Sequence, residues 1–328
     1  MKIALILGVG GQTGSYLSEI LLKKHYYVLG LIRKSSVNNT ERLQHILTNK
    51  NLKLIYGDVT DQSSVRSVID KYHPEEVYNL AAQTMVAESW NQPFSFVNSI
   101  VDGTLNCLES IREVDKTIKM FHAASSEIFA GTTESPQNEQ TACCPTNPYG
   151  SAKLCAFNLV KNYREKYGMF ACNGICYNHD SERRNEYFIT KKISIAVAKI
   201  KAGKQNRIVL GDLTAQRDWS YAKDIAEAMH LMLQAKQPKD YILSSGKTHT
   251  VQELVQFAFQ AAEIYDWEKY VEIDQSLVRP KESVIFCGDN TKAKTELKWK
   301  PKVKFEDLIK NMVEFEIEKE MEHACETI

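Results

Sequence analysis

The chain has 328 residues, of which 43% are apolar and 25% are charged, and its 41 basic residues equal its 41 acidic ones. This is the composition of an ordinary globular protein with one large domain or two small ones. The zero net charge argues against a dedicated nucleic-acid binder, which usually carries a basic excess. No apolar run approaches the roughly 20 residues that a membrane-spanning helix requires.

The cysteines exclude a familiar kind of metal site. None of the eight forms a CxxC pair, and no pair of histidines lies near Cys172 and Cys176 to complete a zinc set. We therefore expect no metal, reduced and mostly buried thiols, and a cytoplasmic location. The first residues, MKIALILG, are too short and wrongly flanked for a signal peptide.

Short apolar runs alternate with amphipathic segments through the first half of the chain. The apolar runs predict strands at 3–8, 27–33, 52–58, 76–82 and 118–125. Helical spacing between them predicts helices at 15–24, 38–48, 63–72 and 94–112. Such alternation, with strands that are apolar on both faces, is typical of a Rossmann-type, doubly wound parallel α/β sheet.

The second half is more mixed. It contains a predicted helix near 149–166, strands at 170–178, 207–212 and 241–246, and helical patterns at 251–265 and 305–323. We expect residues 1–177, with parts of 214–245, to form a nucleotide-binding domain. Residues 178–213 and 246–328 are expected to form a smaller, mixed C-terminal substrate domain.

The segment GVGGQTG separates the first predicted strand from the first predicted helix, with Gly8, Gly11 and Gly14 three residues apart. Gly8 allows a tight turn, Gly11 lets a pyrophosphate approach the backbone, and Gly14 permits close packing of helix on strand. This position in the chain favours dinucleotide binding over a simple turn.

The second strand ends without an acidic residue. NAD-selective sites usually place Asp or Glu there to bind the ribose 2′-hydroxyl. Here the strand ends LIRKSS, and Arg33 with Ser35 and Ser36 suits a 2′-phosphate, which predicts NADP. Asp58, after the third strand, is placed to bind the adenine amine, although it could equally cap the turn that follows.

A possible catalytic group comes from two segments. Tyr149 and Lys153 in PYGSAK are four residues apart, which puts both on one face of a helix. A nearby ammonium and a positive nicotinamide would lower the pKa of the tyrosine below its usual value near 10. Ser125, at the end of the preceding strand, is a plausible third partner, and the carboxylate of Glu127 follows it in AASSEIF.

These features together resemble the extended short-chain dehydrogenase/reductase superfamily. The motifs NPYGSAK, NHDSERR and RDWSYAKD are more specific, and the chain is similar nearly end to end to the GDP-mannose 4,6-dehydratase family. The resemblance implies conversion of a GDP-hexose to its 4-keto-6-deoxy form with NADP bound throughout the cycle.

The resemblance also gives Glu127 a role. Tyr149 would remove the C4 hydroxyl proton while a hydride leaves C4, and Glu127 would take the C5 proton and help the C6 hydroxyl depart as water. Burial should raise the pKa of Glu127. The alternative, a nucleotide-sugar 4-epimerase or 4-dehydrogenase, needs no acid beside Ser125. A catalytically silent scaffold has no reason to keep Ser125, Tyr149 and Lys153.

Further contacts are implied by matching motifs. For the cofactor they are Gly8, Gly11, Gln12, Thr13, Gly14, Arg33, Ser35, Ser36, Asp58, Val59, Leu80, Ala81, Ala82, Tyr149, Lys153, His179 and Arg184. For the GDP-sugar they are Ser126, Asn178, Lys192, Gly211, Arg217, Arg279 and Glu282. His179 is expected to be a hydrogen-bonded histidine rather than a catalytic one, and Trp219 to lie in the core. Each basic residue alone would more often be a surface ion pair.

The polar stretch RKSSVNNTER is expected to be an exposed loop that reaches a neighbouring subunit, which implies a homotetramer or homodimer. The chain departs from the family pattern at Leu7, before the glycine loop, and at Met85, Ala130 and the segment 182–187, which lie near the sugar by motif position. None removes a proton-transfer group. They leave the substrate open between GDP-D-mannose and GDP-D-glycero-D-manno-heptose.

Overall fold

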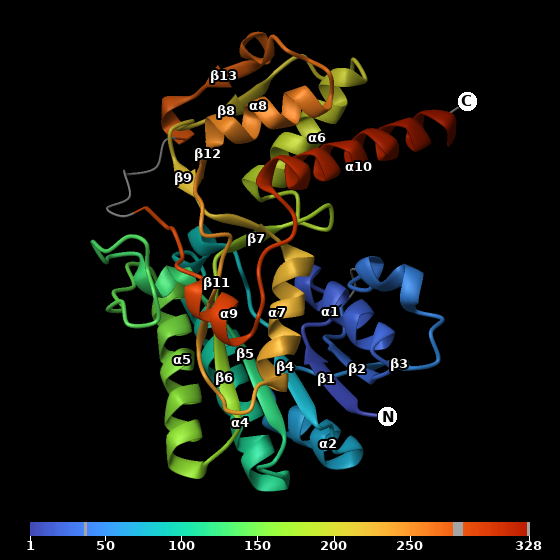
Figure 1. Cartoon of the computed structure of the whole chain (residues 1–328). Coiled ribbons are helices and arrows are strands. Elements are labelled where there is room, and N and C mark those ends of the chain that lie inside the picture. Colours follow the sequence, from blue (N-terminus) through green and yellow to red (C-terminus); the bar gives the residue numbers. More distant parts are fainter. Residues whose placement is uncertain (36–37, 278–284, 327–328) are drawn as a thin grey trace.

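The computed structural model describes residues 1–35, 38–277 and 285–326. Its centre is a seven-stranded sheet in the order β11-β6-β5-β4-β1-β2-β3, with helices on both faces (Figure 1). All neighbouring strands of this sheet run parallel. The strands are β1 (Ile3–Leu7), β2 (Tyr27–Ile32), β3 (Leu52–Tyr56), β4 (Glu76–Asn79), β5 (Lys119–Ser125), β6 (Ala171–Cys176) and β11 (Tyr241–Leu243). The predicted doubly wound α/β fold is confirmed.

Alternate residues of β1 point into the two halves of the core. Ala4 and Ile6 pack against α1 (Gln12–Lys23) and α7 (Ala222–Gln234). Leu5 and Leu7 pack on the other face, against α2 (Gln62–Tyr72), α4 (Gly103–Val114) and α5 (Pro148–Tyr167). This burial on both faces explains why the strand is continuously apolar.

The order of the strands reverses between β1 and β4. The chain winds outward from β1 through β2 to β3, and then returns to β4 on the other side of β1. In open parallel sheets, ligands bind beyond the carboxyl ends of the strands at such a reversal. The glycine loop follows β1, and Leu80, Ala81 and Ala82 follow β4, so both segments lie at this point.

A second core lies above the sheet in Figure 1, between α6 (Ile189–Lys201), α8 (Val251–Ala261) and α10 (Phe305–Glu326). The short parallel strands β8 (Ile208–Leu210) and β13 (Val271–Ile273) border it. Trp219, which is 3% exposed, stacks on Phe305 in this core with ring centroids 5.2 Å apart. The prediction that Trp219 is a core residue is confirmed.

Several predicted elements are longer than the observed ones, and two of the differences have a clear physical reason. The strand expected at 170–178 ends at Cys176, and residues Asn178–Asp180 form β7, which pairs with β10 (Trp219–Tyr221) in a separate sheet. The helix expected at 38–48 is only a 3-10 turn, Glu41–Ile46. The side chain of Asn38 accepts hydrogen bonds from the amide and hydroxyl of Thr40, which favours a turn over a helix start. Only one side chain of the turn, Leu43, is buried, so little packing would support a longer helix.

The second half also holds helices that the sequence did not predict, α6 and α7, and the small α9 (Thr291–Glu296), which packs on β11. The expected burial of the thiols is partly wrong: Cys107, Cys172 and Cys176 are buried, but Cys143, Cys144 and Cys155 are exposed. Among the helices in the described ranges, none is both long and apolar enough to cross a membrane.

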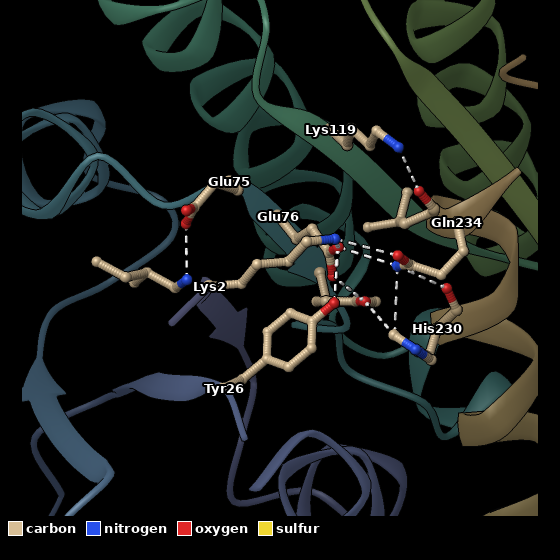
Figure 2. A network of polar contacts seen from close by, with 10 residues as sticks. Lys2, Tyr26, Glu75, Glu76, Lys119, His230 and Gln234 are labelled. Atoms are coloured by element: carbon tan, nitrogen blue, oxygen red, sulfur yellow. Dashed lines mark hydrogen bonds and ion pairs between the residues drawn. The ribbon is translucent and has the colours of Figure 1, made fainter. Parts of the chain in front are cut away.

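A buried carboxylate anchors the amino-terminal edge of the sheet (Figure 2). Glu76, which is 1% exposed, accepts hydrogen bonds from Tyr26 at 3.0 Å, Tyr78 at 2.7 Å and Gln234 at 2.9 Å, and pairs with Lys2 at 3.3 Å. Burial alone would raise the pKa of Glu76, but these donors outweigh it and the pKa is lowered. The network ties β1, β4 and α7 together.

Candidate active site

Two glycines of the glycine loop, Gly8 and Gly14, have no room for a side chain. Gly8 has a φ of 84°, and a Cβ on it would lie 2.9 Å from the backbone nitrogen of Ala81. A Cβ on Gly14 would lie 2.5 Å from the carbonyl oxygen of Gly8, so helix α1 packs directly on the end of β1. Gly11 precedes the helix, and no side chain of the described residues caps its start. The free amides of this helix start fit the pyrophosphate of a dinucleotide.

The first turn of α1 is fastened to β7 and the residue after it. Gln12 donates to the carbonyl of His179 at 2.9 Å and accepts from Ser181 at 2.8 Å. Nδ1 of His179 lies 2.8 Å from the carbonyl oxygen of Tyr177 and must donate to it, because a carbonyl only accepts. In the neutral ring Nε2 is then the acceptor, and it accepts from the hydroxyl of Thr13 at 3.0 Å. Burial, with the charge of Arg184, lowers the pKa of His179 and keeps it neutral. The hydrogen-bonded role expected for His179 is confirmed.

The residues predicted to contact the adenosine end of the cofactor follow β2 and β3. Arg33 is exposed and follows β2 directly, and Asn39 donates to its carbonyl at 2.6 Å. Asp58 accepts from the amide and hydroxyl of Thr60, so it shapes the turn after β3, while Asp61 caps α2. Ser36 lies outside the described residues, and the carbonyl of Val59 accepts from Asn106 at 2.9 Å.

The structure brings Ser125, Tyr149 and Lys153 together. Ser125 ends β5, next to Cys176 on β6, and its side chain acts to lower the pKa of Tyr149. Tyr149 and Lys153 lie one turn apart on α5 and are 7% and 4% exposed. The ammonium of Lys153 donates to the carbonyl of Ala123 at 2.7 Å and lies 5.8 Å from the centre of the tyrosine ring.

The pKa of Tyr149 differs from the sequence-based expectation. Burial raises it to about 12, the charge of Glu127 adds to this, and the hydrogen bond from Ser125 and the charge of Arg184 oppose it. Burial also lowers the pKa of Lys153 to about 8. The expected lowering of the tyrosine pKa therefore does not occur in the chain by itself. Burial disfavours the charged phenolate of Tyr149 and also the charged ammonium of Lys153, so the lysine does not offset it.

Glu127 lies two residues beyond the end of β5, on the 3-10 turn Ser126–Phe129. Its amide donates to the hydroxyl of Ser125 at 3.3 Å, and its carboxylate accepts from the side chain of Asn147 at 2.8 Å. It is half-buried, and its bond to Asn147 places its carboxylate beside the start of the helix that carries Tyr149. Asn147 was not among the site residues predicted from the sequence, although an Asn before Pro-Tyr is a typical helix start.

Arg184 lies in the segment that follows β7. Its Nε is 2.7 Å from the carboxylate of Asp180, and its guanidinium lies 3.4 Å from the centre of the Phe188 ring. Its charge acts on the pKa of both Tyr149 and His179. Arg42, from the polar loop expected to reach a neighbour, donates to the carbonyl of Arg183 of the same chain at 2.7 Å.

The predicted sugar contacts lie on the elements beyond β6. Asn178 begins β7, Lys192 on α6 donates to the carbonyl of Val209 at 3.1 Å, and Gly211 follows β8. Arg217 lies on β9 (Gln216–Arg217), 5.8 Å from the centre of the Phe286 ring, and β9 pairs with β12 (His249–Thr250). Ser126 is buried beside Ser125, and Arg279 and Glu282 lie outside the described residues.

A cavity of about 510 Å³ lies elsewhere, behind the turn that carries Glu127. Ile128 and Phe129 form part of its wall, together with Arg164 and Asp240, which are paired at 2.8 Å. None of the predicted catalytic residues lines it. Its charged lining is largely committed to internal pairs, so it is not part of the candidate active site.

Comparison with known proteins agrees with this geometry. The chain is 48% identical to GDP-mannose 4,6 dehydratase 2 of Arabidopsis thaliana, over 97% of this chain and 87% of that protein. It is 40% identical to the human GDP-mannose 4,6 dehydratase, over 97% and 92% of the two chains. The crystal structure of dTDP-glucose 4,6-dehydratase from Bacillus anthracis, in complex with NAD, shares the fold, with a TM-score of 0.85, 20% identity and 98% of each chain covered. Residues 5–312 match the family described as GDP-mannose 4,6 dehydratase, and the chain belongs to this family.

Proposed function

We propose that the chain dehydrates a GDP-hexose, with GDP-mannose as substrate, to the 4-keto-6-deoxy sugar. The family match supports this reaction class over a 4-epimerase or 4-dehydrogenase. The observation that carries the proposal is the position of Glu127, two residues after Ser125, with its carboxylate bonded to Asn147 at the start of the helix that carries Tyr149. An oxidation at C4 needs Ser125 and Tyr149 only, whereas loss of water across C5 and C6 needs an acid as well.

The chain's own residues would move the protons. Tyr149, held by Ser125, takes the proton of the C4 hydroxyl, and the C4 ketone that results makes the C5 proton acidic. Glu127 takes the C5 proton and passes it to the C6 hydroxyl, which leaves as water. A double bond then joins C5 and C6 of the sugar. C5 then gains a proton, and the proton that Tyr149 took from the C4 hydroxyl balances it, so both side chains return to their starting state. Bound NADP would accept the hydride from C4 and supply it again to C6.

A nicotinamide cofactor fits the loop at Gly8–Gly14, where a Cβ at Gly8 or Gly14 would collide with backbone. Preference for NADP rests on Arg33, which follows β2 at the place where NAD-binding sites carry an acid. Arg184 would lie near the cofactor, because its charge acts on both Tyr149 and His179.

We also propose which parts of the chain bind the GDP-sugar. Residues 178–213 and 246–328 would bind the GDP-sugar, and Lys192 and Arg217 would face its diphosphate. A GDP-manno-heptose is the second candidate substrate, because its C6 hydroxyl could leave by the same steps and Met85, Ala130 and Glu182 depart from the family pattern near the sugar. A homotetramer or homodimer in the cytoplasm is the expected assembly.

The test is a mass-spectrometric assay of the purified chain with NADP and either GDP-mannose or GDP-manno-heptose. We expect a product lighter by one water. Glu127→Gln should abolish this product while reduced nicotinamide still accumulates by its absorbance, and Tyr149→Phe should abolish both signals. Absence of water loss with every GDP-hexose and GDP-heptose at high enzyme concentration would overturn the proposal.

A further inference from the structure

We infer that Asn147 is a positioning residue for elimination: one side-chain amide starts helix α5 with its oxygen and holds the carboxylate of Glu127 with its nitrogen. The inference rests on the proposed function, because it gives Asn147 a part in the step that Glu127 would perform. Asn147 is the residue before α5 and lies two residues before Tyr149.

The two ends of this amide cannot exchange roles. Oδ1 accepts the backbone amide of Gly150 at 2.8 Å, and a backbone N–H can only donate. Nδ2 must therefore face the other way, where it donates to Oε2 of Glu127 at 2.8 Å. The direction of both bonds follows from chemistry alone, so the assignment of oxygen and nitrogen is unambiguous. Glu127 thus receives a donor whose position is set by the start of the helix that carries Tyr149.

The segment that leads to Asn147 is itself attached to the turn that carries Glu127. The amide of Cys144 donates to the carbonyl of Ile128 at 2.8 Å, and the amide of Gly131 donates to the carbonyl of Cys144 at 2.6 Å. Pro148 then fixes the first residue of the helix. Asn147 therefore approaches Glu127 from a segment held on the same turn, and the contact does not depend on a mobile loop tip.

This arrangement has a chemical consequence. A hydrogen bond to a carboxylate favours its charged form and opposes the rise in pKa that burial causes. It also restricts rotation of the carboxylate, so the direction from which Glu127 approaches a C5 proton is fixed relative to Tyr149. Proton abstraction is sensitive to such alignment, and a displacement of about 1 Å can cost on the order of 100-fold in rate.

The first variant for the test is Asn147→Ser. Serine caps helices about as well as asparagine, so α5 should keep its start, but the short hydroxyl cannot also reach Glu127. The matched control is Asn138→Ser in the same connecting segment, where the side-chain oxygen of Asn138 accepts the amide of Gln140 at 2.8 Å. Both substitutions exchange an amide that holds a backbone N–H for a hydroxyl.

Two steps are then measured separately in the enzyme saturated with NADP and GDP-mannose. The first is the rise of reduced nicotinamide in a single turnover, and the second is exchange of the C5 proton in deuterated water, followed by mass spectrometry. For Asn147→Ser we expect the first rate to stay within about twofold and the second to fall about 10- to 100-fold. Asn138→Ser should change neither.

Asn147→Asp supplies a second readout, because aspartate also caps a helix but presents an oxygen to Glu127. Two carboxylates at this distance raise the pKa of one of them, so the acidic limb of the pH profile for C5 exchange should move to higher pH. A purely structural cap would leave that limb in place.

The outcomes separate the inference from the proposed function. If wild-type enzyme loses water but Asn147→Ser slows both steps equally, or neither, the positioning role is wrong. If the wild-type enzyme produces no dehydrated sugar, the proposed function fails independently of Asn147.

Discussion

The carbonyl oxygen of Glu127 lies against Gly150, so closely that a Cβ atom on this glycine would stand 2.7 Å from it. The obstructing atom belongs to the backbone and cannot rotate away, as the end of a long side chain could. The first turn of α5 and the turn that carries Glu127 therefore touch only because residue 150 has no side chain. The separation of Tyr149 from Glu127 depends on this contact.

We predict that Gly150→Ala lowers kcat by about 100-fold, because the added methyl group must push the two turns apart. The free energy of unfolding should fall by only about 1–3 kcal/mol, the usual cost of overpacking. Steady-state kinetics and denaturant unfolding would measure the two effects. Ser151→Ala, an exposed position in the same turn, is the control. Full activity in Gly150→Ala would show that the contact does not set the geometry.

The buried ammonium of Lys153 should make stability depend on pH. Its pKa is about 8 in the fold against 10.5 for an ordinary lysine, so the unfolded chain binds more protons between these values. Stability should thus rise with pH from 8 to 10.5, by roughly 3 kcal/mol for this group. Urea unfolding of wild type and Lys153→Met at pH 7 and pH 10 measures the difference. The free energy of unfolding of the wild type should increase relative to that of Lys153→Met between pH 7 and pH 10. A difference that is the same at both pH values would contradict the lowered pKa of Lys153.

Arg33→Asp should weaken NADP binding. The substitution replaces the proposed partner of a 2′-phosphate by an acid that repels it and can accept from a 2′-hydroxyl. We expect the Kd for NADP to rise about 10- to 100-fold while the Kd for NAD changes less. Calorimetric titration with both cofactors tests this, with Lys116→Asp as a charge-matched control outside the predicted site. Equal weakening for both cofactors would argue against a role in selecting NADP.

Glu76→Gln should destabilise the sheet without touching the active site. The charged form of Glu76 is favoured in the fold, since the pKa is lowered from 4.5. Its contribution should therefore be present above pH 4.5 and be lost as the pH falls through the lowered pKa. We expect a loss of about 2–3 kcal/mol at pH 7, the scale for a disturbed buried charged network. Glu314→Gln, in a surface pair with Lys310, serves as the control and should unfold like the wild type.

The lowered pKa makes a further check possible. Because only the wild type loses this contribution in acid, its advantage over Glu76→Gln should shrink at pH 3. Urea midpoints at pH 7 and pH 3 measure it. A difference between the two proteins that is the same at both pH values would contradict the network in Figure 2.

Local rules predicted the parts of the fold that depend on neighbours in the chain. The alternation of β1 and α1 and the glycine spacing follow from short-range patterns, and so does the Tyr149–Lys153 pair. The end of β6 at Cys176 could not be predicted in the same way. It depends on β10, which is far along the chain and in which Trp219 pairs with Asn178 in a separate sheet.

The candidate site divides in the same manner. Ser125, Glu127, Tyr149 and Lys153 were identified from residue types and resemblance, and the structure brings them together at the end of β5 and the start of α5. In the chain by itself the pKa of Tyr149 is raised and not lowered, because charge partners are visible in a sequence but the depth of burial is not. Asn147 had a visible signal, an Asn before Pro at a helix start, but its second bond to Glu127 exists only in three dimensions.

The contact of Gly150 with Glu127 closes a short loop in the chain, from the end of β5 to the first turns of α5. Every group proposed to handle a proton lies inside that interval, and the proposed sugar contacts beyond it begin only at Asn178. The groups that would carry out the chemistry therefore lie on one short stretch of sequence, whereas the proposed sugar contacts extend from Ser126 in this stretch to elements far along the chain. A single added methyl group at Gly150 is expected to alter the chemistry itself.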